Sequence, residues 1–97
     1  MSWQIVFRSI AQQEFAAATE WYDARRPGLG AEFIAEVRNT TARIAMHPHS
    51  FAVARGNVRR TRVTRFPYSV YYRIMEDSIV ILAVYHNARR PGGWKRR

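Results

Sequence analysis

The stretch "SIVILAVYH", from Ser78 to His86, decides the fold because it is apolar at nearly every position. Side chains of an extended strand point alternately to the two faces of a sheet. One face would carry Ile79, Ile81, Ala83 and Tyr85, and the other Val80, Leu82, Val84 and His86. A strand that is apolar on both faces must be covered on both, so we expect a central strand of a sheet.

Two more strands are predicted just before this one. "NVRRTRVTRF" (Asn57 to Phe66) and "YSVYYRIM" (Tyr68 to Met75) are short β-prone runs, and their period is near two. Short links at Pro67 and at Glu76–Asp77 suit a meander of hairpins. The stretch from Phe51 to Ala54 is either a further edge strand or a loop.

The N-terminal half changes to a helical period. "WQIVF" (Trp3 to Phe7) predicts a short strand, and Ser9 then resembles a helix N-cap, with Gln12 completing a capping box. The first helix is predicted from Ile10 to Ala24. Its apolar face is formed by residues that recur every three or four positions, namely Ala11, Phe15, Ala18 and Tyr22.

A second helix is predicted after the break "RRPGLG" (Arg25 to Gly30), from Leu29 to Met46, and Pro48 ends it. Its apolar stripe is Leu29, Phe33, Val37, Thr41 and Ile44, widened by Ile34. Two helices joined by so short a turn should form an antiparallel hairpin. The fold expected is therefore α+β, in the order β-α-α-β-β-β, with the N-terminal helical hairpin packed on a small, twisted, mainly antiparallel sheet.

Composition is consistent with one domain spanning residues 1–97. Hydrophobic residues make up 47% of the 97 residues, which suits a packed core. The chain has no cysteine, so disulfides and thiolate metal sites have no part in it. No apolar run approaches the ~18 residues of a membrane span, and the N-terminus lacks a signal-peptide pattern. We expect a cytoplasmic protein without a membrane partner.

Charge is distributed unevenly along the chain. The net charge is +9, yet residues 1–54 hold five arginines and five acids. Residues 55–97 hold eleven cations and two acids, so the whole excess lies there. Fifteen of the sixteen cations are arginine, whose planar donor fork suits phosphate and carboxylate. An anionic partner is expected, either nucleic acid or an acidic protein segment.

Individual residues allow a structural and a functional interpretation. The arginines of 57–66 either protect an edge strand from aggregation or form a binding surface. Tyr71 and Tyr72 are either core residues or stacking surfaces. His86 either hydrogen-bonds a loop at the strand end or acts as a general base. His47 and His49 flank Pro48 and are interpreted as helix C-terminal caps, since no histidine has metal-ligand spacing.

Four segments together resemble the RelE/ParE superfamily of type II toxin–antitoxin toxins. They are "EWYDARRPGLGAEFIAEV" (Glu20 to Val37), "HP" (His47–Pro48), "RRTRVTRFPYSVYYRI" (Arg59 to Ile74) and "ILAVYHNARRPGGW" (Ile81 to Trp94). The resemblance implies a small antiparallel sheet backed by a helical hairpin. It also implies a growth-inhibiting toxin, without a cofactor, that a cognate antitoxin neutralises. Such an antitoxin uses an acidic or amphipathic segment, forms a hetero-oligomer with the toxin, and suits a groove beside the helices.

The superfamily divides by target. RelE-like members cleave mRNA in the ribosome, whereas ParE-like members poison DNA gyrase and are not nucleases. RelE-like sequences often place a catalytic arginine in a "YRLVY"-type strand, and the matching "YSVYY" (Tyr68 to Tyr72) has Ser69 there. Some also end with a catalytic tyrosine, which "RPGGW" lacks. The resemblance therefore favours the ParE-like, plasmid-stabilisation branch, a DNA gyrase inhibitor without enzymatic activity.

Two alternatives follow from the same residues. A RelE-like protein would be a metal-independent, ribosome-dependent mRNA endoribonuclease, with Arg65, Tyr71, His86 and Arg89 as its catalytic constellation. A basic nucleic-acid-binding module without toxicity is the second alternative. The target- or antitoxin-binding residues expected are Arg59, Arg60, Arg62, Arg65, Tyr72, Arg89, Arg90, Trp94, Lys95 and Arg96. The end "GGWKRR" is expected to be flexible, with Trp94 as an anchor on the sheet.

Overall fold

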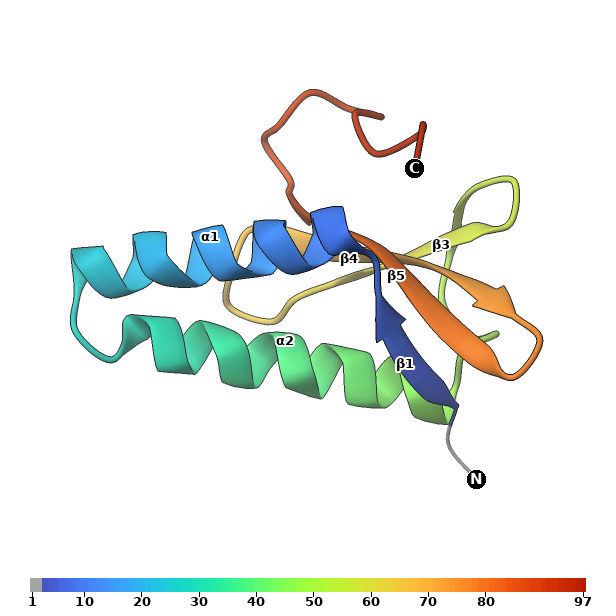
Figure 1. The fold of residues 1–97 in the computed structure, drawn as a ribbon, viewed down its shortest axis with the longest axis horizontal. Coiled ribbons are helices and arrows are strands. Elements are labelled where there is room, and N and C mark those ends of the chain that lie inside the picture. Colours follow the sequence, from blue (N-terminus) through green and yellow to red (C-terminus); the bar gives the residue numbers. More distant parts are fainter. Residues whose placement is uncertain (1–2) are drawn as a thin grey trace.

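The computed structural model describes residues 3–97, and it has the α+β architecture that the sequence predicts (Figure 1). One strand is added to the predicted order, because the segment left open between 51 and 54 forms a short edge strand at 53–55. No helix between residues 3 and 97 is long and apolar enough to cross a membrane. The elements are β1 (Gln4–Phe7), α1 (Ser9–Arg25), α2 (Leu29–Met46), β2 (Val53–Arg55), β3 (Val58–Arg62), β4 (Tyr68–Met75) and β5 (Ser78–His86).

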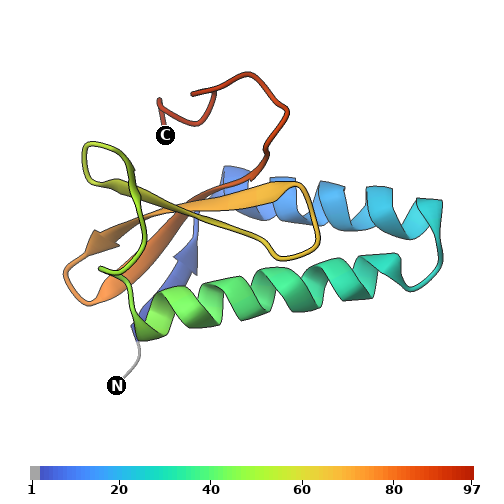
Figure 2. The ribbon, with the colours of Figure 1, turned by 180° about the vertical axis from the view of Figure 1, so that it is seen from behind.

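The five strands form one sheet in the order β1-β5-β4-β3-β2. β1 pairs with β5 in parallel, whereas the other neighbours are antiparallel, so the sheet is mainly antiparallel as predicted. β5 lies inside the sheet, which its apolar sequence requires. Seen from behind, α2 runs under one face of the sheet, and the C-terminal chain lies over the other face (Figure 2).

The turn between the helices explains the "PGLG" sequence. Gly28 has a φ of 92°, a left-handed conformation that favours glycine. Asp23 fixes the turn, because its Oδ1 accepts hydrogen bonds from the backbone amides of Gly28 at 3.0 Å and Gly30 at 3.2 Å. A Cβ at Gly30 would lie 2.9 Å from the Thr19 carbonyl oxygen. The two helices can therefore approach closely only with glycine at this position.

The start of α1 differs from the prediction. The helix begins at Ser9, so Arg8 is the N-cap residue and no side chain caps the helix. The backbone N–H of Arg8 donates to the carbonyl of Ile81 at 2.9 Å, which continues the pairing of β1 with β5. Because this bond holds Arg8 in the sheet, the connection to the helix is a single residue. The prediction of a capping box formed by Ser9 and Gln12 is therefore wrong.

The main core lies between the helices and one face of the sheet. Helix α1 contributes Ala11 and Ala18, and α2 contributes Phe33, Val37 and Ile44, all at most 5% exposed. Thr40 is fully buried whereas Thr41 is partly exposed, so the predicted stripe was wrong at that position. The sheet residues that complete this core are Val70, Tyr72, Ile79, Ile81 and Val84.

A bulge in β5 changes the predicted alternation of its faces. Tyr71 pairs with Ala83 but Tyr72 pairs with Ile81, so Leu82 is an extra residue opposite β4. Past the bulge the faces exchange. Val84 joins Ile79 and Ile81 in the main core, whereas Ala83 and Tyr85 form a second cluster on the opposite face. The predicted grouping of Ala83 and Tyr85 with the isoleucines was wrong.

Strand β3 is shorter than the predicted run from 57 to 66. It ends at Arg62, and the N–H of Val63 donates to the carbonyl of Tyr68 at 2.9 Å across a loop. In that loop Arg65 has a φ of 72°, which is uncommon for a residue with a Cβ. Phe66 is 8% exposed and packs on the core from this loop, not from a strand.

Candidate functional site

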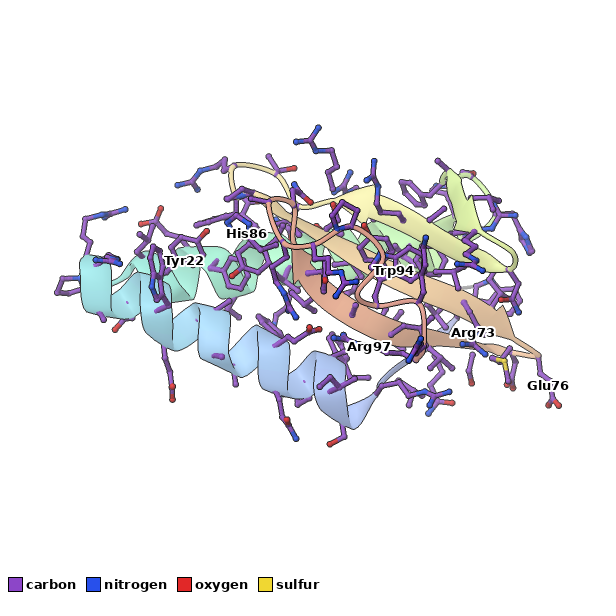
Figure 3. The ribbon with its side chains drawn as sticks, turned by 90° about the horizontal axis from the view of Figure 1, so that it is seen from above. Tyr22, Arg73, Glu76, His86, Trp94 and Arg97 are labelled. Carbon is purple, nitrogen blue, oxygen red and sulfur yellow. The ribbon has the colours of Figure 1, made fainter. Side chains whose placement is uncertain are left out.

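The C-terminal segment (residues 87–97) packs against the face of the sheet opposite α2 (Figure 3). The indole of Trp94 stacks on the ring of Tyr71 at 4.4 Å between centroids and is only 6% exposed. The hydroxyl of Tyr85 donates to the carbonyl of Arg90 at 2.9 Å. Trp94 thus anchors the C-terminal segment on the sheet, as the sequence predicts.

Glu14 joins α1, β5 and the C-terminal segment. β1 pairs with β5 only as far as Ile81, so the next edge amides of β5 lack a strand partner. Glu14 Oε1 accepts the N–H of Val84 at 3.0 Å. The two carboxylate oxygens also accept from the Arg97 guanidinium at 2.7 and 2.8 Å, and Arg89 donates at 3.1 Å. The side chains of Glu14 and Arg97 are 12% and 15% exposed, so this pair is mostly buried, whereas Arg89 is half exposed.

Sequence reasoning missed Glu14, although its spacing carries a signal. Ala11, Glu14 and Ala18 are three and four residues apart, so the glutamate lies on the apolar stripe of the helix. A carboxylate on a buried stripe needs charged or hydrogen-bonding partners. The signal shows that a partner exists but not which arginine supplies it.

A groove of about 680 Å³ opens between α1 and the C-terminal end of β5. Its most exposed aromatic residue is Trp21, at 53%, and the Arg25 guanidinium lies 4.1 Å from the centre of that indole. Burial raises the pKa of the Tyr22 and Tyr68 hydroxyls. The lining residues are mostly apolar: Glu14, Ala17, Ala18, Trp21, Tyr22, Pro67, Tyr68, Val84, His86 and Arg89.

His86 lines this groove, and its imidazole already accepts a hydrogen bond from the backbone. Its Nδ1 accepts the backbone N–H of Ala88 at 3.0 Å, so the ring hydrogen of the neutral imidazole is assigned to Nε2. The ring meets Tyr68 edge-on at 5.0 Å. Arg89 lines the same groove, but its guanidinium contacts Glu14 and lies 4.2 Å from the centre of the Tyr85 ring.

The other two residues of the predicted catalytic constellation are outside the groove lining. Arg65 forms ion pairs with Glu32 at 2.6 Å and Glu36 at 3.5 Å on α2. These contacts raise the pKa of Arg65 and hold that of the Glu32 carboxyl below its usual value. Tyr71 is 8% exposed and packs with Trp94 in the second cluster. Only His86 and Arg89 of the four share the groove.

Ser69 occupies the position at which RelE-like sequences often have an arginine. It is fully buried, and its hydroxyl donates to Asn87 Oδ1 at 2.7 Å. The backbone N–H of Asn87 donates to the carbonyl of Pro67 at 2.8 Å. Ser69 therefore fixes the first residue of the C-terminal segment against β4.

Two of the predicted binding residues serve the fold. The guanidinium of Arg59 donates to the carbonyls of His49 at 3.2 Å and Phe51 at 2.7 Å, and so holds the loop before β2. Tyr72 is fully buried, its hydroxyl donates to the Pro48 carbonyl at 2.6 Å, and burial raises its pKa. These two side chains are directed at neighbouring backbone.

The remaining predicted cations are exposed on the side of the sheet that the C-terminal segment covers. Directly paired residues share a face, and Arg60 pairs with Tyr71 and Arg62 with Ser69. Arg55 of β2, which sequence reasoning missed, pairs with Val58 of the second cluster. We call this surface the basic sheet face and define it by Arg55, Arg60, Arg62, Arg90, Lys95 and Arg96, all exposed.

Metal-binding side chains are not clustered in the part of the chain that the structure describes. Within residues 3–97, no group of three or more histidine, aspartate or glutamate side chains is placed to hold a metal ion. The groove and the basic sheet face thus offer apolar contacts and guanidinium donors, which suit the binding of a partner.

Comparisons with known proteins agree with this fold. A chain of the "Chromosomal ParDE TA system from P. aeruginosa" superposes with a TM-score of 0.77 at 16% sequence identity, covering 88% of this chain and 96% of that chain. A search of curated proteins gave no match. Residues 5–91 match the family described as "ParE toxin of type II toxin-antitoxin system, parDE". That match spans most of the chain, so this protein belongs to the ParE toxin family of type II toxin–antitoxin systems.

Proposed function

We propose that this toxin inhibits DNA gyrase by binding to it, and that it does not cleave RNA. The observation that carries the proposal is the match to the ParE toxin family over residues 5–91. The contacts of Ser69 support it. Stabilising the extra negative charge of a cleaving phosphate requires a cation or aligned donors. A buried serine hydroxyl that donates to Asn87 supplies no such charge.

The separation of the four candidate catalytic residues supports the same conclusion. A general base must be within hydrogen-bond reach of the proton that it takes. His86 has its Nδ1 occupied by the Ala88 amide, and Tyr71 is covered by Trp94. Arg65 is held by carboxylates of α2. Each residue thus has a structural partner, which favours a binding protein over a nuclease.

We infer further that a cognate antitoxin neutralises the toxin by inserting an amphipathic segment into the groove beside α1. Grooves of this kind receive the apolar face of a helix or an extended peptide. Exposed tryptophan is a common energetic anchor at such interfaces, and Trp21 is 53% exposed at the rim. Arg25 beside Trp21 complements an acidic flank of the same segment.

The groove assignment is tested with Trp21→Ala and the protein encoded by the adjacent gene. Losing an anchor worth about 2 kcal/mol weakens binding about 30-fold. Met46→Ala is the matched control, because Met46 is 59% exposed at the far end of α2. Calorimetric titration should show the 30-fold loss for Trp21→Ala and less than a threefold change for the control. Equal affinities of the two variants would place the antitoxin elsewhere.

The gyrase proposal is tested by a supercoiling assay with purified gyrase and relaxed plasmid. Toxin at micromolar concentration should stop supercoiling, and addition of the antitoxin should restore it. A toxin that leaves supercoiling unchanged, but induces cuts in mRNA at the ribosomal A site, would contradict the proposal and establish the RelE-like alternative.

A further inference from the structure

The basic sheet face differs from the rest of the surface in having cations without acids. No acidic residue occurs in β1 to β5 or in residues 87–97. Five of the seven acids lie on the two helices, and Glu76 and Asp77 form the turn between β4 and β5. Of the helix acids, Glu14 reaches the strands and is occupied by Arg89 and Arg97. The field over this face is therefore positive and has no internal counterion.

The six side chains of the basic sheet face are free to contact a ligand. Among residues 3–97, none of them takes part in an ion pair or a side-chain hydrogen bond. This distinguishes them from Arg59, Arg65, Arg89 and Arg97, whose guanidinium groups are already satisfied by the fold. The unpaired cations come from the β2–β3 hairpin and from the C-terminal segment. The segment is held on the sheet by the stacking of Trp94 on Tyr71.

The composition of this face suits phosphate better than a protein partner. A protein interface needs an apolar centre, whereas contact with the nucleic-acid backbone is made mainly by arginine and lysine. The aromatic rings under this face are covered, with Tyr71, Tyr85 and Trp94 at most 8% exposed. Met75 lies on the same face, because it alternates with Tyr71 along β4. It is the last residue of that strand, so it does not form an apolar centre. The large apolar groove lies beside α1 instead.

We propose that the basic sheet face binds the phosphate backbone of duplex DNA, so that the toxin contacts the DNA that gyrase holds as well as the enzyme. The contact with DNA held by gyrase rests on the proposed function, whereas the binding of duplex DNA does not. The aromatic side chains available for stacking on unpaired bases are buried, which favours a duplex over a single strand. Contacts to phosphate alone carry no base sequence, so the binding is expected to be nonspecific and steeply salt-dependent.

The test uses the purified full chain and a fluorescein-labelled 30-bp DNA duplex, with affinity measured by fluorescence anisotropy between 50 and 300 mM salt. Each neutralised phosphate contributes about −0.9 to the slope of log K against log salt, which is about eightfold in affinity at 0.1 M. Arg60→Gln with Arg62→Gln should therefore weaken binding about 50-fold and reduce the slope by about 2. The expected wild-type slope is about −3 to −5, from three to five phosphate contacts.

The matched control is Arg38→Gln with Arg43→Gln, which removes the same charge from the exposed surface of α2. It should change the affinity less than threefold, and both double variants should melt within a few degrees of the wild type. Equal losses in the two double variants would overturn the proposal, because net charge alone would then explain binding. So would an absence of binding at 50 mM salt and micromolar toxin, or tenfold tighter binding of a single-stranded RNA.

Two further measurements separate this proposal from others. If the Arg60 and Arg62 double variant keeps its DNA affinity but binds the antitoxin more weakly, the face is a protein interface and the proposal is wrong. If duplex binding follows the prediction while gyrase is unaffected by the toxin, the DNA site stands and the proposed function fails. If gyrase is inhibited and duplex binding is absent, the proposed function stands and the DNA site is wrong.

Discussion

Replacing Glu14 by alanine should destabilise the protein by about 3 kcal/mol. Breaking one partner of a fully buried ion pair costs about 3–5 kcal/mol, because the other charge remains without compensation. Glu14 and Arg97 keep 12% and 15% exposure, which moves the cost to the lower end of that range. The Val84 amide also loses its acceptor. Its cost of about 1–3 kcal/mol overlaps with the first, because water can enter once the network opens.

Urea denaturation followed by circular dichroism measures this loss, and thermal melting should fall by about 12–24 °C for a domain of this size. Glu20→Ala is the control, because Glu20 is an exposed acid on the same helix, and such substitutions cost less than about 0.5 kcal/mol. Glu14→Gln should fall between the two, since its amide oxygen can still accept from Val84. If Glu14→Ala unfolds within 0.5 kcal/mol of the control, the network does not stabilise the fold and the reasoning is refuted.

Two other predictions concern the helical hairpin. Gly30→Ala should cost about 1–3 kcal/mol in urea denaturation, because the added Cβ meets the Thr19 carbonyl at 2.9 Å; an unchanged midpoint would contradict the close helix approach. Arg65 lowers the pKa of Glu32 in the folded state, so this ion pair stabilises the protein above the unfolded-state pKa of about 4.3 and stops doing so as pH falls through the folded value. Glu32→Gln should therefore be less stable than the wild type at pH 7, and this gap should close as the pH falls through the folded-state pKa of Glu32. A gap that is independent of pH would contradict the assignment.

The elements that the sequence predicts best are those with turn-forming or helix-breaking residues at both ends. The helix at 29–46 and the strands at 68–75 and 78–86 have the predicted bounds, because glycine, proline and acidic turn residues flank them. The first helix was misplaced at its start, since a hydrogen bond from Arg8 to β5 decides where the strand ends. That bond joins residues far apart in the sequence, and local pattern carries no record of it.

The faces of the sheet were less predictable than its strands. The bulge at Leu82 adds one residue to a continuous apolar run, so composition alone does not reveal it. It becomes visible only in the pairing of β5 with β4. The same shift puts Tyr85 on the side where Trp94 packs, which explains why the C-terminal segment contacts the sheet.

The candidate site was predicted as a list of cations and aromatic residues with His86, and the structure divides that list. Alternation along β3 directs Arg60 and Arg62 to the face covered by the C-terminal segment, and Arg59 to the loop carbonyls. Sequence could suggest this division but not which guanidinium groups find partners within the fold. The resemblance implied a groove beside the helices, but its lining escaped prediction because those residues come from α1, the β3–β4 loop and the end of β5.

The most direct test of the proposed function is the trapping of cleaved DNA by gyrase. Purified gyrase, supercoiled plasmid and ATP are incubated with the toxin, then treated with detergent and protease, and linear DNA is measured on a gel. Linear plasmid should accumulate with toxin concentration, and prior addition of the antitoxin should prevent it. Plasmid that stays supercoiled at micromolar toxin, with no linear product, would contradict the account.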